Sequence, residues 1–336
     1  MQMPMRRLGS SGLTVSRLCF GTMTFGSQWE HIGATTQRDA DALVDRCLEA
    51  GINFFDSADV YSGGEAEESL GKALGKRRQH VILATKVRGR MADDPNAVGL
   101  TRHHILNAVD ASLRRLGTDW IDLYQVHCWD AATPIEETLR ALDDCVRWGK
   151  VRYLGASNFA AWQLMQALGV AERDGLERFV TLQPLYNLVI RDVENEIVPL
   201  CQDQGLGILP WSPLAGGFLS GKFRRGAPPP RESRRGRAEQ QFLVFDEARG
   251  FDAVEALGEI AAAHEATVAQ AALNWLLAKP WVTAAIFGAR TLAQLEDNLG
   301  ALRWELNTDE MARLDAILPP PRLYPRWFID MFNAER

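Results

Sequence analysis

The sequence predicts a (β/α)₈ barrel, the α/β fold in which eight parallel strands form a cylinder inside a ring of helices. Three observations lead to this prediction: short apolar runs alternate strictly with amphipathic stretches, there are eight such pairs, and they span most of the 336 residues. A doubly wound open sheet shows the same alternation but fits eight units less well. Since no linker interrupts the pattern, we expect one domain over residues 1–336.

The eight strands are predicted from runs of four to seven mostly apolar residues. They are expected at 15–21, 53–56, 81–86, 121–127, 151–156, 179–183, 206–211 and 284–287. Each run precedes a stretch in which apolar residues recur every three or four positions, as on one face of a helix. These helices are expected at 36–51, 65–74, 101–116, 134–148, 161–173, 193–204, 251–264 and 292–302, with two more at 266–277 and 308–318.

Two segments depart from the alternation. Residues 221–249 hold three consecutive prolines and many arginines, which predicts a long mobile loop. The tail at 319–336 begins with three prolines and carries Tyr324, Trp327, Phe328 and Phe332. Because so many aromatic residues are unusual in a disordered tail, we expect it to fold over the mouth of the barrel.

Composition excludes several classes of protein. With 37 Lys and Arg against 43 Asp and Glu, the net charge is −6, which argues against a nucleic-acid partner. No run approaches the roughly 20 apolar residues that cross a bilayer, so no membrane segment is expected. The five cysteines are scattered and odd in number, which is typical of free thiols in the cytoplasm. The histidines form no pattern of metal ligands.

Four ionisable residues lie at the ends of predicted strands or in the loop that follows, where reactive groups lie in such barrels. They are Asp56, Tyr61, Lys86 and His127. Each alone has an ordinary explanation as a cap, core residue or surface charge, but four at one end favour a catalytic site. Lys86 would lower the pKa of Tyr61, Asp56 would hold Lys86, and His127 would orient a carbonyl as a neutral donor.

The motifs that contain these residues resemble the aldo-keto reductase superfamily. The resemblance is carried by the segments 51–61 (GINFFDSADVY), 84–86 (ATK), 122–127 (DLYQVH), 155–158 (GASN), 183–187 (QPLYN), 211–222 (WSPLAGGFLSGK) and 287–290 (FGAR). They occur in the family's order over essentially the whole chain, most like bacterial members that also resemble potassium-channel β subunits. The resemblance implies that Tyr61 is the general acid and base of a hydride transfer, assisted by Asp56, Lys86 and His127.

The resemblance also implies a nicotinamide dinucleotide extended across the barrel. Its carboxamide would contact Ser157, Asn158 and Gln183, and its ring would stack on Trp211. The complete set of implied cofactor residues is Gly21, Thr22, Met23, Asp56, Ser157, Asn158, Gln183, Trp211, Ser212, Pro213, Leu214, Gly216, Gly217, Lys222, Arg225, Phe287, Gly288, Arg290, Gln294, Asp297 and Asn298. NADP(H) is favoured over NAD(H), because Arg290 and Gln294 suit a 2′-phosphate and the arginine-rich loop at 221–249 is expected to cover the bound cofactor.

The substrate is expected to be a small carbonyl or alcohol compound: an aldehyde, a ketone, or a sugar-like or bulky polycyclic alcohol. Its pocket would be lined by Trp29, Val60, Tyr61, His127 and Trp129. The alternative function is a nicotinamide-binding regulatory subunit with vestigial catalysis, since fold alone does not define function. The sequence leaves open whether the protein is a monomer or a homo-oligomer.

Overall fold

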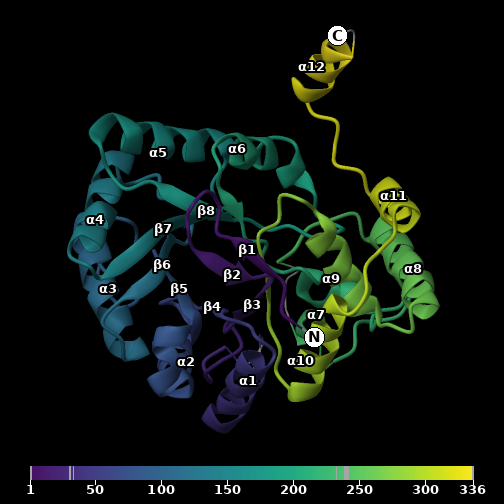
Figure 1. Ribbon diagram of the computed structural model, residues 1–336, viewed down its shortest axis with the longest axis horizontal. Helices are drawn as coiled ribbons and strands as arrows, with labels where there is room; N and C mark the ends of the chain where they lie inside the picture. The colour runs from purple at the N-terminus through teal and green to yellow at the C-terminus, as the bar shows by residue number, and fades with distance from the viewer. Residues whose placement is uncertain (1, 30–31, 33, 232, 238–241, 335–336) are drawn as a thin grey trace.

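A computed structural model of the chain describes residues 2–29, 32, 34–231, 233–237 and 242–334 (Figure 1). Its main sheet has eight strands, all paired in parallel, in the order β10-β3-β4-β5-β6-β7-β8-β9. They are β3 (Leu18–Gly21), β4 (Phe54–Asp56), β5 (Ile82–Val87), β6 (Ile121–Val126), β7 (Val151–Ser157), β8 (Phe179–Gln183), β9 (Gly207–Ile208) and β10 (Ala285–Phe287).

The two ends of this sheet meet. Ile208 forms a parallel bridge with Val282, and the Ile286 amide donates to the Pro210 carbonyl at 2.9 Å. The backbone around β9 and β10 therefore closes the cylinder. The prediction of a (β/α)₈ barrel is confirmed.

Most of the helices surround the strands, and only α12 among the described helices stands away from them, as Figure 1 shows. They are α1 (Gln37–Glu49), α2 (Glu65–Leu74), α3 (Arg102–Leu116), α4 (Ile135–Arg147), α5 (Ala161–Asp174), α6 (Ile197–Asp203), α7 (Arg234–Arg237), α8 (Glu247–Ala263), α9 (Val268–Ala278), α10 (Leu292–Leu299), α11 (Thr308–Ile317) and α12 (Arg326–Asn333). Caps explain several starts: the hydroxyls of Thr36 and Thr101 accept from the third amide of α1 and α3. None of the described helices is long and apolar enough to span a membrane.

The predicted strand at 15–21 is two strands. Its first half, β2 (Thr14–Ser16), pairs antiparallel with β1 (Met5–Arg7), and only β3 belongs to the barrel. The side chains of Leu8 and Val15 are fully buried in one cluster with residues of the barrel strands. The hairpin therefore closes one end of the barrel with apolar side chains.

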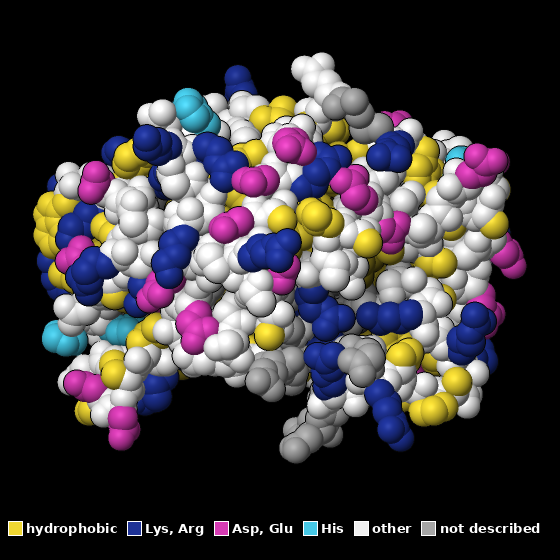
Figure 2. All heavy atoms as spheres, turned by 90° about the horizontal axis from the view of Figure 1, so that it is seen from below, with side chains coloured by type: hydrophobic (Ala, Val, Ile, Leu, Met, Phe, Trp, Pro, Cys, Tyr) yellow, Lys and Arg dark blue, Asp and Glu magenta, His cyan; other side chains and the backbone are white. Residues whose placement is uncertain are grey.

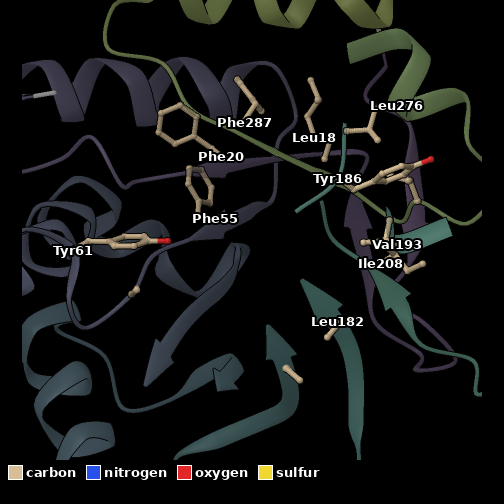
Figure 3. Close-up of a cluster of buried hydrophobic side chains, with 14 of the residues drawn as sticks. Leu18, Phe20, Phe55, Tyr61, Leu182, Tyr186, Val193, Ile208, Leu276 and Phe287 are labelled. Carbon is tan, nitrogen blue, oxygen red and sulfur yellow. The ribbon is translucent and has the colours of Figure 1, made fainter. Parts of the chain in front are cut away.

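The strands place successive side chains on opposite faces of the sheet. Phe54 belongs to the cluster inside the barrel, whereas the next residue, Phe55, packs between strands and helices. In that outer layer the rings of Phe55 and Phe287 lie 6.3 and 5.7 Å from the ring of Phe20 (Figure 3). Two apolar layers therefore hold the barrel together.

Polar residues replace apolar ones inside the barrel as its strands end. Asp56 follows the interior Phe54 by two positions, Lys86 follows Ala84, and Gln125 follows Leu123. The side chains of Asp56, Lys86 and Gln125 are all buried. The alternation of the strands therefore places a buried polar layer at the carboxyl end of the barrel, opposite the hairpin.

The C-terminal tail does not cover the barrel mouth, so that prediction is wrong. All residues at 321–334 are exposed, and Figure 1 shows α12 standing away from the barrel beyond α11. The three prolines at 319–321 end α11 and lead the chain outward, and the tail's aromatic rings contact one another instead of the barrel.

The segment at 221–249 contains the short helix α7. The Arg235 guanidinium lies over the Phe218 and Phe223 rings, at 5.1 and 5.5 Å from their centres, which ties α7 to the barrel. Residues 232 and 238–241 of the predicted loop lie outside the described residues. That the loop moves stays a prediction.

Candidate active site

Lys86 joins the side chains of Asp56 and Tyr61. Its ammonium group contacts the Asp56 carboxylate and donates to the Ser57 carbonyl at 2.7 Å and to the Tyr61 hydroxyl at 3.2 Å. Tyr61 is placed by a tight turn after β4, in which Ser62 and Gly63 have φ angles of 47° and 62°. Figure 3 shows its hydroxyl directed inward. The structure therefore brings these three predicted residues together.

Two glutamines complete the surroundings of Asp56. Gln125 and Gln183 donate to the same carboxylate oxygen, Oδ2, at 3.1 and 2.9 Å. Asp56 thus has an ammonium group on one oxygen and two amides on the other, which satisfies a buried charge. Sequence reasoning missed Gln125, although the alternation that places His127 at the strand end also directs Gln125 into the barrel.

The pKa of Tyr61 differs from the expectation. Burial raises it, and the nearby positive charge of Lys86 offsets this rise only in part. The physical reason is that Lys86 is already paired with Asp56, whose negative charge acts on Tyr61 in the opposite sense. The phenol is therefore protonated at neutral pH and is available as a proton donor.

His127 faces Tyr61 from the end of β6. The two rings lie 5.8 Å apart, edge to face, and the backbone amide of His127 donates to the Val87 carbonyl at 2.9 Å. Burial, with the positive charges of Lys86 and Arg88, lowers the pKa of His127 to about 3. Its imidazole is therefore neutral at physiological pH, as predicted for a hydrogen-bond donor.

The residues expected at the carboxamide form one network. Asn158 donates to the His127 carbonyl at 2.9 Å and to the Ser157 hydroxyl at 3.0 Å, and accepts from the Trp211 indole at 3.1 Å. Ser157 in turn donates to the Gln183 carbonyl at 2.8 Å. The amides, hydroxyl and indole of this network lie beside His127, where a flat polar ring would meet them.

The loop after Trp211 has an unusual backbone. Ser212, Ala215, Gly216 and Gly217 all have positive φ angles, between 48° and 92°. Successive amides in such conformations form concave sites that bind anions. A Cβ added at Gly217 would lie 2.6 Å from the Lys222 ammonium, which folds back over the loop. The absence of a side chain at Gly217 thus leaves space for the Lys222 ammonium beside backbone amides that can bind an anion.

Three cations gather beside this loop. The charge of Arg290 lowers the pKa of both Lys222 and Arg234, although burial is the larger cause for each. Among the described residues, none of these three side chains forms an ion pair. Arg234 also lies close enough to Tyr61 for their charges to interact. Sequence reasoning counted Arg234 only among the arginines of the loop, because nothing local separates it from its neighbours.

A cavity of about 440 Å³ opens beside these cations. It is lined by Ala34, Arg237, Arg290, Thr291 and Gln294. The Gln294 side chain accepts from the Arg290 amide at 2.9 Å, which holds the two residues together. On the face shown in Figure 2, Lys and Arg side chains gather in the lower right part of the view, whereas Asp and Glu are scattered. This end of the site suits an anionic group.

Two predicted cofactor residues are engaged elsewhere. Arg225 pairs with Asp252 of α8 at 2.6 Å and also contacts Glu255 there. Asp297 accepts from Thr267 and Gln270 on the α9 side, at 2.8 and 2.9 Å. Most of the remaining predicted residues lie at strand ends or in the loops that follow, namely Gly21, Thr22, Met23, Pro213, Leu214, Phe287 and Gly288. Asn298 lies within α10 and is buried.

Aromatic side chains surround Tyr61 and His127. The Trp29 ring lies 5.8 Å from that of Tyr61, and the half-buried Val60 precedes Tyr61 in the chain. Trp129 follows His127 by two residues and contacts the rings of Phe159 and Trp162 at 5.3 and 5.8 Å. The proton donors therefore lie within an apolar, aromatic rim. Within the described residues no group of His, Cys, Asp and Glu could hold a metal ion.

A closed (β/α)₈ barrel thus holds a buried Asp, Lys and Tyr together at the carboxyl end of its strands. The model of the aldo/keto reductase family matches residues 17–319, and this chain belongs to that family. It is 40% identical to an uncharacterised oxidoreductase of Bacillus subtilis over 94% of this chain and 95% of the relative.

Two further relatives show the range of the family. The chain is 34% identical to versiconal hemiacetal acetate reductase of Aspergillus parasiticus, over 95% of this chain and 98% of the relative. It is 39% identical to a probable voltage-gated potassium channel subunit beta of Arabidopsis thaliana, over 89% of this chain and 91% of the relative. Enzymes and channel subunits thus share this barrel.

Proposed function

We propose that the protein is an NADP(H)-dependent oxidoreductase that interconverts carbonyl compounds and alcohols. The observation that carries the proposal is the Lys86 ammonium, which contacts both the Asp56 carboxylate and the Tyr61 hydroxyl. A protonated phenol beside a fixed positive charge can give its proton to a carbonyl oxygen, because Lys86 stabilises the phenolate that remains.

The residues present fit a dinucleotide. The amide and hydroxyl network of Ser157 and Asn158 would hold the carboxamide, and Trp211 would cover the ring. The positive-φ backbone at 212–217 and Lys222 would hold the pyrophosphate. Bound there, the cofactor supplies the hydride that the substrate carbon accepts.

The chain itself supplies the proton and the orientation. Tyr61 and the neutral His127 would both hydrogen-bond the carbonyl oxygen, and Tyr61 would release its proton to that oxygen as the alcohol forms. In the reverse direction the phenolate would take the proton back. The aromatic rim of Trp29 and Trp129 favours aromatic or polycyclic carbonyl compounds, because flat rings stack well on indole faces.

The preference for NADP(H) is supported by the cations near the cavity. Arg290 and Arg234 lack ion pairs among the described residues, so they are available to a phosphate. A 2′-phosphate would form charge-assisted hydrogen bonds with such groups, whereas the 2′-hydroxyl of NAD(H) would not.

The test is consumption of NADPH and NADH with 4-nitrobenzaldehyde and 9,10-phenanthrenequinone, followed for the wild type and Tyr61→Phe. We expect turnover with a higher kcat/KM for NADPH, and its loss in the variant. The channel-subunit relative supports a second candidate, a regulatory dinucleotide-binding subunit. Tight cofactor binding without turnover of any carbonyl compound would favour that candidate.

A further inference from the structure

The tail beyond α11 exposes an unusual amount of apolar surface. Tyr324, Trp327, Phe328 and Phe332 are 75%, 45%, 42% and 50% exposed, and Leu323, Ile329 and Met331 are each about half exposed. Within the described part of the chain, their ring contacts are with one another, for example 4.9 Å between Phe328 and Phe332. The tail thus has an aromatic cluster without a cover from the rest of the described chain.

The length of α12 indicates that something covers it. A helix of eight residues is marginal in water, so it needs packing against another surface to persist. At roughly 200 Å² for each aromatic side chain, the four rings expose roughly 400 Å². Each partner in a stable complex buries about 800 Å². One tail therefore supplies about half of what one partner in a stable interface buries.

The charges of the tail favour a protein surface over a lipid bilayer. Helices that lie on membranes carry a strongly basic polar face. On α12, by contrast, Arg326 is paired with Asp330 at 3.1 Å, and Arg322 leaves the described part of the tail with a single net positive charge. An electrostatic attraction to anionic lipid is therefore weak.

The same chain carries a second uncovered aromatic surface. Trp162 and Met165 on α5 are 64% and 42% exposed, and the Trp162 ring contacts Trp129 at the barrel mouth. Figure 1 shows α11 against α8 on the right of the barrel and α12 standing clear above the barrel, whereas α5 runs along its upper left edge. The tail of one chain therefore lies apart from the aromatic surface of its own barrel.

We propose that α12 packs on the surface formed by Trp129, Trp162 and Met165 of a second copy of this chain. If each copy placed its α12 on this surface of the other copy, the two chains would form a dimer with two equivalent contacts. Such a closed two-fold dimer is the most common homo-oligomer. Each chain then contributes its tail and its α5 surface, which raises the area buried toward that of a stable dimer. The tail of one copy would border the substrate pocket of the other, a consequence that rests on the proposed function.

The experiment is size-exclusion chromatography with light scattering over a range of protein concentrations. The wild type is expected at twice the monomer mass. Two double variants, Trp327→Ser/Phe328→Ser and Trp162→Ser/Met165→Ser, are expected as monomers. A mixture of the two is expected to recover a weaker dimer, because one intact tail still meets one intact surface. Trp148→Ser, which removes an exposed tryptophan outside both surfaces, is the matched control and should remain dimeric.

The readout is a mass, so it does not depend on the reaction proposed above. A monomeric wild type, a tail variant that remains dimeric, or a monomeric Trp148→Ser would each overturn the proposal. Sedimentation of the wild type, but not of the tail variant, with vesicles of anionic phospholipid would also overturn it in favour of a membrane surface. Normal circular dichroism of each variant excludes loss of dimer through unfolding.

Discussion

Asp59→Asn is expected to change how the stability of the protein depends on pH. Asp59 is fully buried below the turn that carries Tyr61, close to the buried Glu67. Glu67 is paired with Arg115 at 2.7 Å and accepts from Thr85 at 2.6 Å, whereas no side chain hydrogen-bonds the Asp59 carboxyl. Burial, followed by the charge of Glu67, raises the pKa of Asp59 to about 8.

The direction of the effect follows from the protons bound in each state. Between pH 4 and pH 8 the folded protein keeps the Asp59 proton, whereas the unfolded chain has lost it. The folded state is therefore stabilised most at low pH, and this contribution is lost as the pH rises toward about 8. At about 1.4 kcal/mol per pH unit, the loss from pH 5 to pH 7 is about 3 kcal/mol.

Asparagine does not titrate, so the unfolding free energy of the variant lacks this decrease between pH 5 and pH 8. The assay is urea unfolding of the wild type and Asp59→Asn at pH 5, 6, 7 and 8, with the difference in unfolding free energy taken at each pH. Contributions from other groups, such as His127, cancel in that difference. Asp93→Asn, on an exposed loop, is the control and should leave the slope unchanged. A difference that stays constant from pH 5 to pH 8 would show that the folded protein does not hold a proton on Asp59 over this range.

Three other substitutions test the site. Lys86→Met leaves the buried Asp56 without its ion pair and should lower the unfolding free energy by about 3–5 kcal/mol, which thermal and urea unfolding measure; an unchanged stability contradicts the pairing. Arg290→Gln should raise the KM for NADPH by roughly 10- to 100-fold with little change for NADH, as loss of a charged hydrogen bond predicts; equal effects on both cofactors would argue against a phosphate contact. Gly217→Ala should weaken cofactor binding in fluorescence titration, because the residue has a φ of 92° and its Cβ would meet Lys222; wild-type affinity would show that the loop adapts.

The regular part of the fold was predictable from the sequence. The alternation of apolar runs and helical stripes reflects burial directly, and capping residues such as Thr36 and Thr101 mark where helices begin. The division of 15–21 into two strands was not predictable, since Val15 and Leu18 are equally apolar. The two strands differ in their partners, because β2 pairs with β1 whereas β3 pairs with β10.

The site was predictable where local patterns place residues at strand ends. Asp56, Tyr61, Lys86 and His127 are brought together because parallel strands end at one edge. Predicting Gln125 would have required following the alternation of side chains within β6. Predicting Arg234 would have required the path of a long loop, which the sequence does not give. The position of the tail was mispredicted because its aromatic composition indicates that the side chains are buried but not against which surface. In the structure its own barrel does not cover these side chains.

The proposed reaction requires that Tyr61 give its proton to a carbonyl oxygen during hydride transfer. Its most direct test is single-turnover oxidation of bound NADPH by 4-nitrobenzaldehyde, followed by stopped-flow absorbance in the wild type and Tyr61→Phe. Loss of a general acid predicts a rate reduced roughly 10²- to 10⁴-fold, with the Kd for NADPH within about twofold of the wild type. A variant that oxidises NADPH at the wild-type rate would exclude Tyr61 as the proton donor.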